Sequence, residues 1–500
     1  MQRRDFTILL LVTSLCFPIL TFAETILLKS GKTREGKIIE KTDEYIKIDF
    51  NGVPLPYFLD EIESIDGNKI NVLPKENTPV KEAKNIEQDV AASATDSKGQ
   101  QEEVNKKMQN CEDALSKGIA YGQSGKYDEA IAEFNKAITI NPTNANAYLL
   151  RGDTHAKKGE YDKAILDYNK SVEIDQKNPM AFFNRGTTFS KKGSLDQAIA
   201  DYYKVIEINP SYPDVYNNRG NALARKGEFG KAIFDYNKAI EMNPNNANSY
   251  FGRGVAYEKK DNLNQAIYDF SEVIKINPQD AEAYYRRGLI YNKQGNLEQA
   301  ISDYDRAIQI DPNSADYYYD RGLAYGMAHN IEKALYDYEK VIELNPGNSE
   351  AYYLLGICKY EVKDFDQAIM YFSKAIEIKT NHVEAYYWRA LSYDAKQDLD
   401  HALPDYSSAI NFGLNRSDAY INRGVIYTKK ENLEQAIVDF NKAIEIQPND
   451  ARAYNNRALL YFLQKEYDKC WEDVNKAEAL GFSVEPNFKE MLKQASGREK

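Results

Sequence analysis

The sequence predicts a mainly α protein, an α-solenoid of eleven consecutive helix-turn-helix repeats over residues 111–484, with a small β-rich module in front of it. Three observations predict this fold. Proline returns at intervals that are multiples of 34 residues, at Pro142, Pro210, Pro244, Pro278, Pro312, Pro346 and Pro448. In this frame, position 8 of every repeat is Gly or Ala, and position 20 is Ala except for Cys470. Positions 4 and 24 carry an aromatic residue in most repeats.

Residues 1–23 have the pattern of a secretory signal peptide. Two arginines precede an apolar run from Phe6 to Phe22, and a small-x-small cleavage pattern ends at Ala23. We therefore expect cleavage after Ala23 and a periplasmic or secreted mature protein. The alternative is an uncleaved membrane anchor, for which the run is short. Membrane contact is expected only in that case.

Residues 24–74 differ in kind, because short β-rich runs replace the repeat. In the stretch YIKIDF, which ends at Phe50, apolar and polar residues alternate, as is typical of a half-buried strand. The Asn51-Gly52 pair that follows favours a two-residue hairpin turn. The segment predicts four or five strands in a small SH3-like or Sm-like barrel. It resembles short β modules at the start of secreted bacterial proteins.

The two segments that flank the repeats are polar. Residues 75–110 contain no aromatic residue and are rich in Lys, Glu, Gln, Asn and Ser, which predicts a flexible linker. Residues 485–500 include a stretch from Asn487 to Ser496 that predicts a polar-faced helix. We expect this helix to cap the last repeat, and a short tail to follow it.

Within each repeat, apolar and small residues recur at helical spacing. Positions 4, 8 and 11 share one helix face, and positions 20, 24 and 27 share another. The small residues let the two helices approach closely, and the proline ends the second helix. The pattern resembles the tetratricopeptide repeat, or TPR, family. That resemblance implies a right-handed superhelix with a concave groove that binds peptides or proteins. The proline is replaced at Gln176, Thr380, Leu414 and Phe482, where altered packing angles are expected.

Position 7 is Arg in nine repeats, and position 23 is Asp in the same nine. The two exceptions change together, because the first repeat has Lys117 with Glu133 and the eighth has Leu355 with Tyr371. We therefore predict structural Arg–Asp salt bridges rather than a row of ligand-binding arginines. A bridge between adjacent repeats is the alternative geometry. The predicted pairs are Arg151–Asp167, Arg185–Asp201, Arg219–Asp235, Arg253–Asp269, Arg287–Asp303, Arg321–Asp337, Arg389–Asp405, Arg423–Asp439 and Arg457–Asp473.

The resemblance implies that position 5 faces the groove. Aromatic side chains there suit a recognition surface, although packing as core is an equal alternative. Asparagines at position 6 are similar to those with which some TPR arrays hold a peptide backbone. The candidate groove residues are Phe183, Asn184, Asn218, Phe251, Tyr285, Tyr319, Tyr353, Tyr387, Asn422 and Asn456. Acidic residues prevail at position 2, where the favoured interpretation is complementarity to the helix dipole.

Composition narrows the function. The net charge of −12 disfavours nucleic acid as a partner. Only 4 His and 4 Cys are present, and no nucleotide-binding or nucleophile motif occurs, so we expect no enzyme, metal, cofactor or small-molecule substrate. The predicted function is an interaction scaffold of the bacterial cell envelope that binds a peptide or protein in the groove. The alternative is a structural spacer or a self-assembling envelope protein without a groove ligand.

Overall fold

A computed structural model describes residues 24–28, 33–41, 45–50, 53–58, 62–65, 68–69, 97–212 and 214–498. The predicted signal peptide lies outside these residues, as do residues 75–96 of the predicted linker. The chain divides into an N-terminal unit, residues 1–262, and a C-terminal unit, residues 263–500. Each unit is described by itself.

The strands form one antiparallel sheet in the order β4-β3-β2-β1-β5-β6. They are β1 (Glu24–Leu28), β2 (Thr33–Lys41), β3 (Tyr45–Phe50), β4 (Val53–Phe58), β5 (Ile62–Ile65) and β6 (Asn68–Lys69). β3 and β4 pair as far as Phe50 and Val53, which fits the predicted hairpin, although its two turn residues lie outside the described ranges. With the short β6, the sheet has six strands, one more than the upper end of the four or five predicted. An SH3-like or Sm-like barrel stays a prediction.

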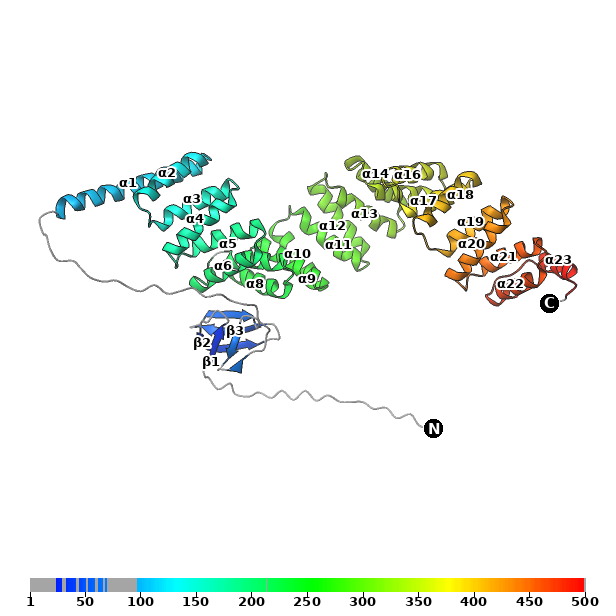
Figure 1. Ribbon diagram of the computed structural model, residues 1–500, viewed down its shortest axis with the longest axis horizontal. Coiled ribbons are helices and arrows are strands. Elements are labelled where there is room, and N and C mark those ends of the chain that lie inside the picture. The colour runs from blue at the N-terminus through cyan, green and yellow to red at the C-terminus, as the bar shows by residue number, and fades with distance from the viewer. Residues whose placement is uncertain are drawn as a thin grey trace, which may run out of the picture. The chain divides into compact units, whose positions relative to one another are not determined.

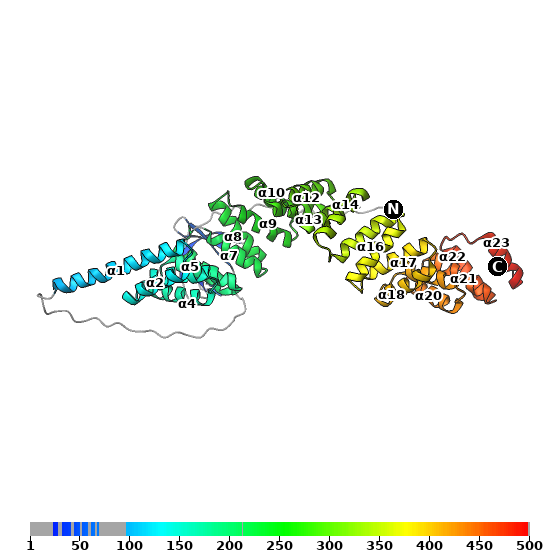
Figure 2. The ribbon, with the colours of Figure 1, turned by 90° about the horizontal axis from the view of Figure 1, so that it is seen from above.

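The helices follow one another in pairs along each unit (Figures 1 and 2). Those of the N-terminal unit are α1 (Ser97–Gln123), α2 (Tyr127–Ile140), α3 (Ala145–Lys157), α4 (Tyr161–Ile174), α5 (Pro179–Lys192), α6 (Leu195–Ile208), α7 (Val215–Arg225), α8 (Phe229–Met242) and α9 (Ala247–Lys259). Those of the C-terminal unit are α10 (Leu263–Ile276), α11 (Ala281–Lys293), α12 (Leu297–Ile310), α13 (Ala315–Met327), α14 (Ile331–Leu344), α15 (Ser349–Glu361), α16 (Phe365–Ile378), α17 (Val383–Ala395), α18 (Leu399–Asn411), α19 (Ser417–Lys429), α20 (Leu433–Ile446), α21 (Ala451–Leu463), α22 (Tyr467–Ala479) and α23 (Pro486–Ser496).

Each repeat is built around a close contact between its two helices. A Cβ added to Gly424 in α19 would lie 2.7 Å from Cε1 of Phe440 in α20. The aromatic ring at position 24 therefore lies directly on the small residue at position 8. The alanines at position 20, such as Ala300 in α12, are fully buried beside this contact. This packing explains why both positions are restricted to small residues.

A left-handed residue at position 15 joins the two helices of a repeat. Gly295 has a φ of 78° between α11 and α12, and Gly193 has a φ of 85° between α5 and α6. The same conformation is imposed on residues with a side chain, such as Gln397 (φ 62°) and Glu431 (φ 60°). Glycine adopts this region without steric cost, whereas the others are strained by it.

First helices approach one another within each unit. α3 contacts α5 and α5 contacts α7, and likewise α11 contacts α13, α15 contacts α17 and α19 contacts α21. The side chains on the exposed side of these odd-numbered helices therefore lie on neighbouring helices of one surface. We call this surface, formed by positions 2, 5, 6 and 9 of the repeats, the first-helix face.

The predicted boundary of the linker needs a correction. The prediction of a flexible linker over residues 75–110 is wrong for residues 97–110, which form the first half of α1. This segment is rich in Glu, Gln and Lys, which disfavour a core but are good helix formers. The second half of α1 packs through Cys111 and Ala114, so the repeat anchors the helix.

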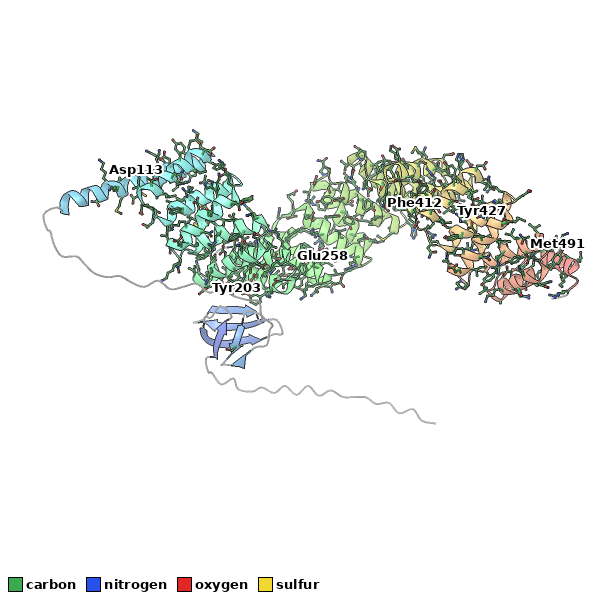
Figure 3. The ribbon with its side chains drawn as sticks, viewed as in Figure 1. Asp113, Tyr203, Glu258, Phe412, Tyr427 and Met491 are labelled. Carbon is green, nitrogen blue, oxygen red and sulfur yellow. The ribbon has the colours of Figure 1, made fainter. Side chains whose placement is uncertain are left out.

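The last helix covers the end of the C-terminal unit. Leu492 of α23 is fully buried, and Phe488 lies 5.3 Å from Phe462 between ring centroids. Trp471 Nε1 in α22 donates a hydrogen bond to Ser496 Oγ at 3.1 Å. Met491, labelled in Figure 3, remains exposed on the outer side of α23. The helix is therefore an amphipathic cap for the last repeat, as predicted.

Candidate functional site

The arginines at position 7 are bound into the frame of the repeats. Arg287 Nε and Nη2 donate to Asp303 Oδ2 and Oδ1 at 2.8 and 2.7 Å. The same two bonds occur in every predicted pair whose members share a unit, namely Arg151–Asp167, Arg185–Asp201, Arg219–Asp235, Arg321–Asp337, Arg389–Asp405, Arg423–Asp439 and Arg457–Asp473. Arg253 and Asp269 lie one in each unit, so their pairing stays a prediction.

The remaining nitrogen of each guanidinium often reaches the preceding repeat. Arg287 Nη1 donates to Ser271 Oγ at 2.9 Å, and Arg321 Nη1 donates to Asp305 Oδ1 at 2.6 Å. Burial disfavours the charged form of Arg321. Its hydrogen bonds to the carboxylates of Asp337 and Asp305 outweigh this effect and raise the pKa of Arg321 above its usual value. The arginine therefore joins two repeats as well as two helices. Its bonds to the frame leave it unsuited to holding a ligand.

The eighth repeat shows an apolar replacement for this pair. Leu355 is fully buried in α15 and packs in a cluster with Tyr338 and Cys358, against which Tyr371 lies. The paired exchange seen in the sequence thus places both side chains at one apolar cluster.

The aromatic residues at position 5 are half-buried and pack on their own repeat. The ring of Tyr285 lies 6.0 Å from Tyr304 at position 24 of the same repeat and 4.7 Å from Tyr317 of the next. Its hydroxyl donates to Asp320 Oδ2 at 2.6 Å. Tyr319 packs likewise on Tyr338, with ring centroids 6.3 Å apart. Each ring therefore packs on its own repeat while part of it stays exposed, and the recognition role of these tyrosines stays a prediction.

Other members of the row follow the same arrangement. Phe183 lies 5.9 Å from Tyr202 and 5.0 Å from Tyr212. Tyr353 lies 6.1 Å from Phe372 between ring centroids. Phe251 in α9 is half-buried.

Tyr387 follows the second alternative predicted for position 5, packing as core, and offers no exposed contact. Only 3% of it is exposed, because the Arg416 guanidinium lies 4.5 Å over its ring and Leu414 packs in the same cluster. The repeat lacks its proline here, and α18 ends at Asn411, just before the exposed Phe412 (Figure 3). The altered junction therefore covers Tyr387.

The asparagines at position 6 make contacts of their own. Asn184 Nδ2 donates to Asp153 Oδ1 at 2.7 Å, and the Tyr168 hydroxyl donates to the same oxygen at 2.8 Å. Burial raises the pKa of Asp153 against these bonds. Asn422 Nδ2 donates weakly to the Tyr406 hydroxyl at 3.4 Å. Asn218 and Asn456 are half-buried on the same face.

Position 9 changes character along the first-helix face. In the N-terminal unit it carries Ile119, Asp153, Thr187, Asn221 and Val255, of which the middle three are polar. In the C-terminal unit it carries aliphatic residues, namely Leu289, Leu323, Ile357, Leu391, Val425 and Leu459. Leu459 is 40% exposed and the others are half-buried. The C-terminal unit therefore presents an aliphatic row beside the tyrosines.

The favoured sequence interpretation gives the acidic residues at position 2 of this face a helix-dipole role and gives none to Asp320 at position 6. The structure places Asp320 against the Tyr285 hydroxyl and gives Asp418 a hydrogen bond of 2.8 Å from the Tyr387 hydroxyl. Burial raises the pKa of Asp320, and the charge of Asp316 adds to that shift. The hydroxyl of the tyrosine at position 5 thus donates a hydrogen bond to an acidic residue of the following repeat. Their spacing of about one repeat was the only signal in the sequence.

The described part of the chain offers no group of three or more His, Cys, Asp or Glu side chains suited to a metal ion. Within that same part, no helix combines the length and apolarity needed to cross a bilayer. Cys111, Cys358 and Cys470 are buried free thiols, and burial raises the pKa of Cys358 to about 11. These thiols therefore serve as packing.

Comparison with protein families identifies the repeat. A model described as TPR repeat matches residues 118–159, 152–193, 188–227, 220–261, 259–295 and 288–328. Models described as tetratricopeptide repeat match residues 315–348, 349–382, 417–450 and 440–472. Together these matches cover more than half of the chain. Proteins built from this repeat mediate protein–protein interactions and are generally not enzymes.

Comparison with individual proteins gives likeness over parts of the chain. No curated protein matches it. The solved structure of YrrB, a TPR protein with an unusual peptide-binding site, is 25% identical, covers 39% of this chain and 97% of its own, and has a TM-score of 0.34. MamA is 32% identical, covers 32% of this chain and 94% of its own, and has a TM-score of 0.32. A tetratricopeptide repeat protein from Parabacteroides merdae is 20% identical, covers 50% and 99%, and has a TM-score of 0.39.

Proposed function

We propose that this chain, which belongs to the tetratricopeptide repeat family, is a non-enzymatic scaffold of the bacterial cell envelope that binds a peptide or protein on its first-helix face. The proposal includes export by residues 1–23, with cleavage after Ala23. The module over residues 24–74, taken as a small SH3-like or Sm-like barrel, would supply a second contact or an anchor.

One observation carries the proposal. The first-helix face of the C-terminal unit places an aliphatic row, a row of half-exposed tyrosines and a row of carboxylates side by side. Tyrosine offers contact area and a hydroxyl at low entropic cost, which suits recognition. Within this unit α11 contacts α13, α15 contacts α17 and α19 contacts α21, so the rows continue from one repeat to the next in each of these pairs. An extended partner could therefore contact many repeats at once.

A pull-down from envelope extract tests the proposal, with the chain from residue 24 onward as bait. The test variant carries Leu323→Lys and Leu459→Lys on the first-helix face. The control carries Tyr336→Lys and Val438→Lys on second helices, where these side chains are 54% and 57% exposed. Circular dichroism checks that all three baits are folded.

A partner that is lost with the first-helix variant and kept by the control supports the proposal. A partner kept by both variants would place binding elsewhere, with residues 24–74 as the next candidate. Loss of the envelope location when residues 1–23 are deleted tests the export signal separately.

Self-assembly is a second candidate function, because apolar side chains are also exposed on second helices. These are Leu166 in the N-terminal unit and Tyr268, Tyr336, Met370 and Val438 in the C-terminal unit. They share position 22 of their repeats. Exposed apolar rows of this kind favour association between copies. Sedimentation analysis of the mature chain decides between the candidates, because a stable monomer excludes self-assembly.

A further inference from the structure

In two repeats of the C-terminal unit, the residue at position 34 lies beside the tyrosine at position 5 and an acid at position 2. In the repeat 383–416 this residue is Arg416, whose guanidinium lies 4.5 Å over the Tyr387 ring. Its Nη2 donates to Asp418 Oδ2 at 2.7 Å, and its Nη1 lies 3.6 Å from Glu384 Oε2. One tyrosine ring and two carboxylates from successive repeats thus surround a single cation.

The preceding repeat holds a histidine in the same arrangement. The ring of His382 lies 5.2 Å from Tyr353, and its Nε2 lies 3.3 Å from Glu350 Oε2. That nitrogen is buried and makes no hydrogen bond in this geometry. The interaction with His382 lowers the pKa of Glu350. At two successive tyrosine–acid subsites the chain itself therefore places nitrogen atoms opposite the carboxylates, namely the Arg416 guanidinium and Nε2 of His382, whose Nδ1 accepts a hydrogen bond from the Ala385 amide at 3.3 Å.

The two repeats before these have the tyrosine and the acids but a short neutral residue at position 34. Asn348, beside Tyr319, accepts a hydrogen bond from the Ala351 amide at 3.0 Å and so is used as a helix cap. Ser314, beside Tyr285, has no side chain long enough to span the acids. Asp316, which belongs to both subsites, forms no ion pair with a described residue. We call these the Tyr285 subsite (Glu282, Tyr285, Asp316) and the Tyr319 subsite (Asp316, Tyr319, Glu350).

A buried hydroxyl without a partner lies in the same region. Tyr304 is fully buried and its ring lies against Tyr285, yet its hydroxyl makes no hydrogen bond among the described residues. In the fourth repeat the equivalent hydroxyl, of Tyr236, donates to Asn221 at position 9. Leu289 holds that position here and cannot accept. An unsatisfied buried hydroxyl costs free energy, which a ligand with an acceptor group can offset.

The local field also favours a cation. Burial raises the pKa of Asp320, and the charge of Asp316 raises it further. Burial and the hydrogen bond to Asp320 likewise raise the pKa of Tyr285. Arg286 Nε donates to Glu282 Oε1 at 2.7 Å. Asp316, which the two subsites share, is therefore the subsite carboxylate whose charge no ion pair among the described residues compensates.

We propose that the Tyr285 and Tyr319 subsites bind arginine or lysine side chains of a cationic segment in the partner protein, one side chain to each repeat. This inference rests on the proposed function and specifies its partner. The incoming cation takes the place that Arg416 holds at Tyr387, between the tyrosine ring and two carboxylates. The backbone carbonyls of the bound segment are acceptors for the Tyr304 hydroxyl. Cation–π contact and paired carboxylates both select arginine and lysine over acidic or neutral segments.

Fluorescence anisotropy with labelled peptides tests the proposal on the full mature chain. The probes are a peptide of alternating arginine and alanine, its glutamate counterpart and its glutamine counterpart. The test variant is Asp316→Asn with Glu350→Gln. The control, Glu298→Gln with Glu332→Gln, removes the same charge from exposed positions in α12 and α14.

We expect the arginine peptide to bind and the test variant to weaken it about tenfold or more, as for loss of charge-assisted bonds. The control should change affinity less than about twofold, because exposed distant charges are screened. Equal weakening by test and control would overturn the subsites and leave only long-range attraction. Binding of the glutamine or glutamate peptide alone would overturn the inference but keep the scaffold function. A natural partner that is captured yet carries no basic segment has the same meaning.

Two further substitutions change whether a side chain of the chain itself occupies a subsite. Ser314→Arg should fill the Tyr285 subsite from within and weaken the arginine peptide about tenfold. Arg416→Ser should empty the Tyr387 subsite and strengthen it by a similar factor, and serine is a favourable residue at this helix N-cap. An unchanged affinity in both variants would contradict the equivalence of the subsites.

Discussion

Replacing Arg287 by leucine tests whether the arginine rows are frame. The substitution removes both bonds to Asp303, of 2.8 and 2.7 Å, and leaves a carboxylate whose side chain is only 7% exposed. Breaking a buried pair costs about 3–5 kcal/mol. Because the Arg287 side chain is 19% exposed, we expect the lower end, about 3 kcal/mol. Adding Asp303→Tyr copies the Leu355–Tyr371 arrangement of the eighth repeat. The double variant should recover most of the loss, to within about 1 kcal/mol of the parent.

Unfolding in urea measures the free energy, and hydrogen exchange in α11 and α12 measures its local part. The local measurement matters because repeat arrays open repeat by repeat. Arg306→Leu is the control, since among the described residues the Arg306 guanidinium hydrogen-bonds to Gln309 of its own helix, and the substitution should cost less than about 0.5 kcal/mol. A single variant as stable as the control would refute the reasoning. So would a double variant no better than the single.

Three further predictions follow from the packing. Gly424→Ala should destabilise α19 and α20 by about 1–3 kcal/mol in urea unfolding, because its Cβ would lie 2.7 Å from the Phe440 ring, and a stabilised variant would contradict this. Glu431→Gly should stabilise the chain by about 0.5–1 kcal/mol by relieving a φ of 60°, and no gain in thermal unfolding would count against strain there. Burial raises the pKa of Tyr319 and Tyr353 to about 12, above the ordinary 10.0, so their contribution to stability is present below pH 10 and is lost as the pH rises towards 12. Tyrosinate absorbance should show this late step, and complete ionisation near pH 10 with helicity intact would contradict it.

Features that repeat along the chain could be predicted from the sequence. The Arg–Asp contact was predictable because the eighth repeat changes both partners together, to Leu355 and Tyr371. The helix pairs followed from the spacing of small and aromatic residues. These signals reflect packing within one repeat, and the same packing recurs from repeat to repeat.

Features that depend on one junction could not be predicted. Arg416 lies over Tyr387 at the junction that follows the end of α18. No periodic pattern in the sequence predicts that contact. Helix α1 extends back to Ser97 through residues whose composition also suits a flexible chain. The contacts of the acids at position 2 depend on the residue at position 34 of the preceding repeat. That residue is Arg416 for Asp418, which it binds, and Ser314 for Asp316.

Photo-crosslinking in the envelope tests the central claim that the first-helix face binds the partner. A photoreactive residue replaces Leu323 or Leu459 on that face, or Tyr336 or Val438 on second helices. We predict a partner adduct at the first pair of positions and none at the second pair. Adducts only at Tyr336 and Val438 would contradict the account and place recognition on the second helices.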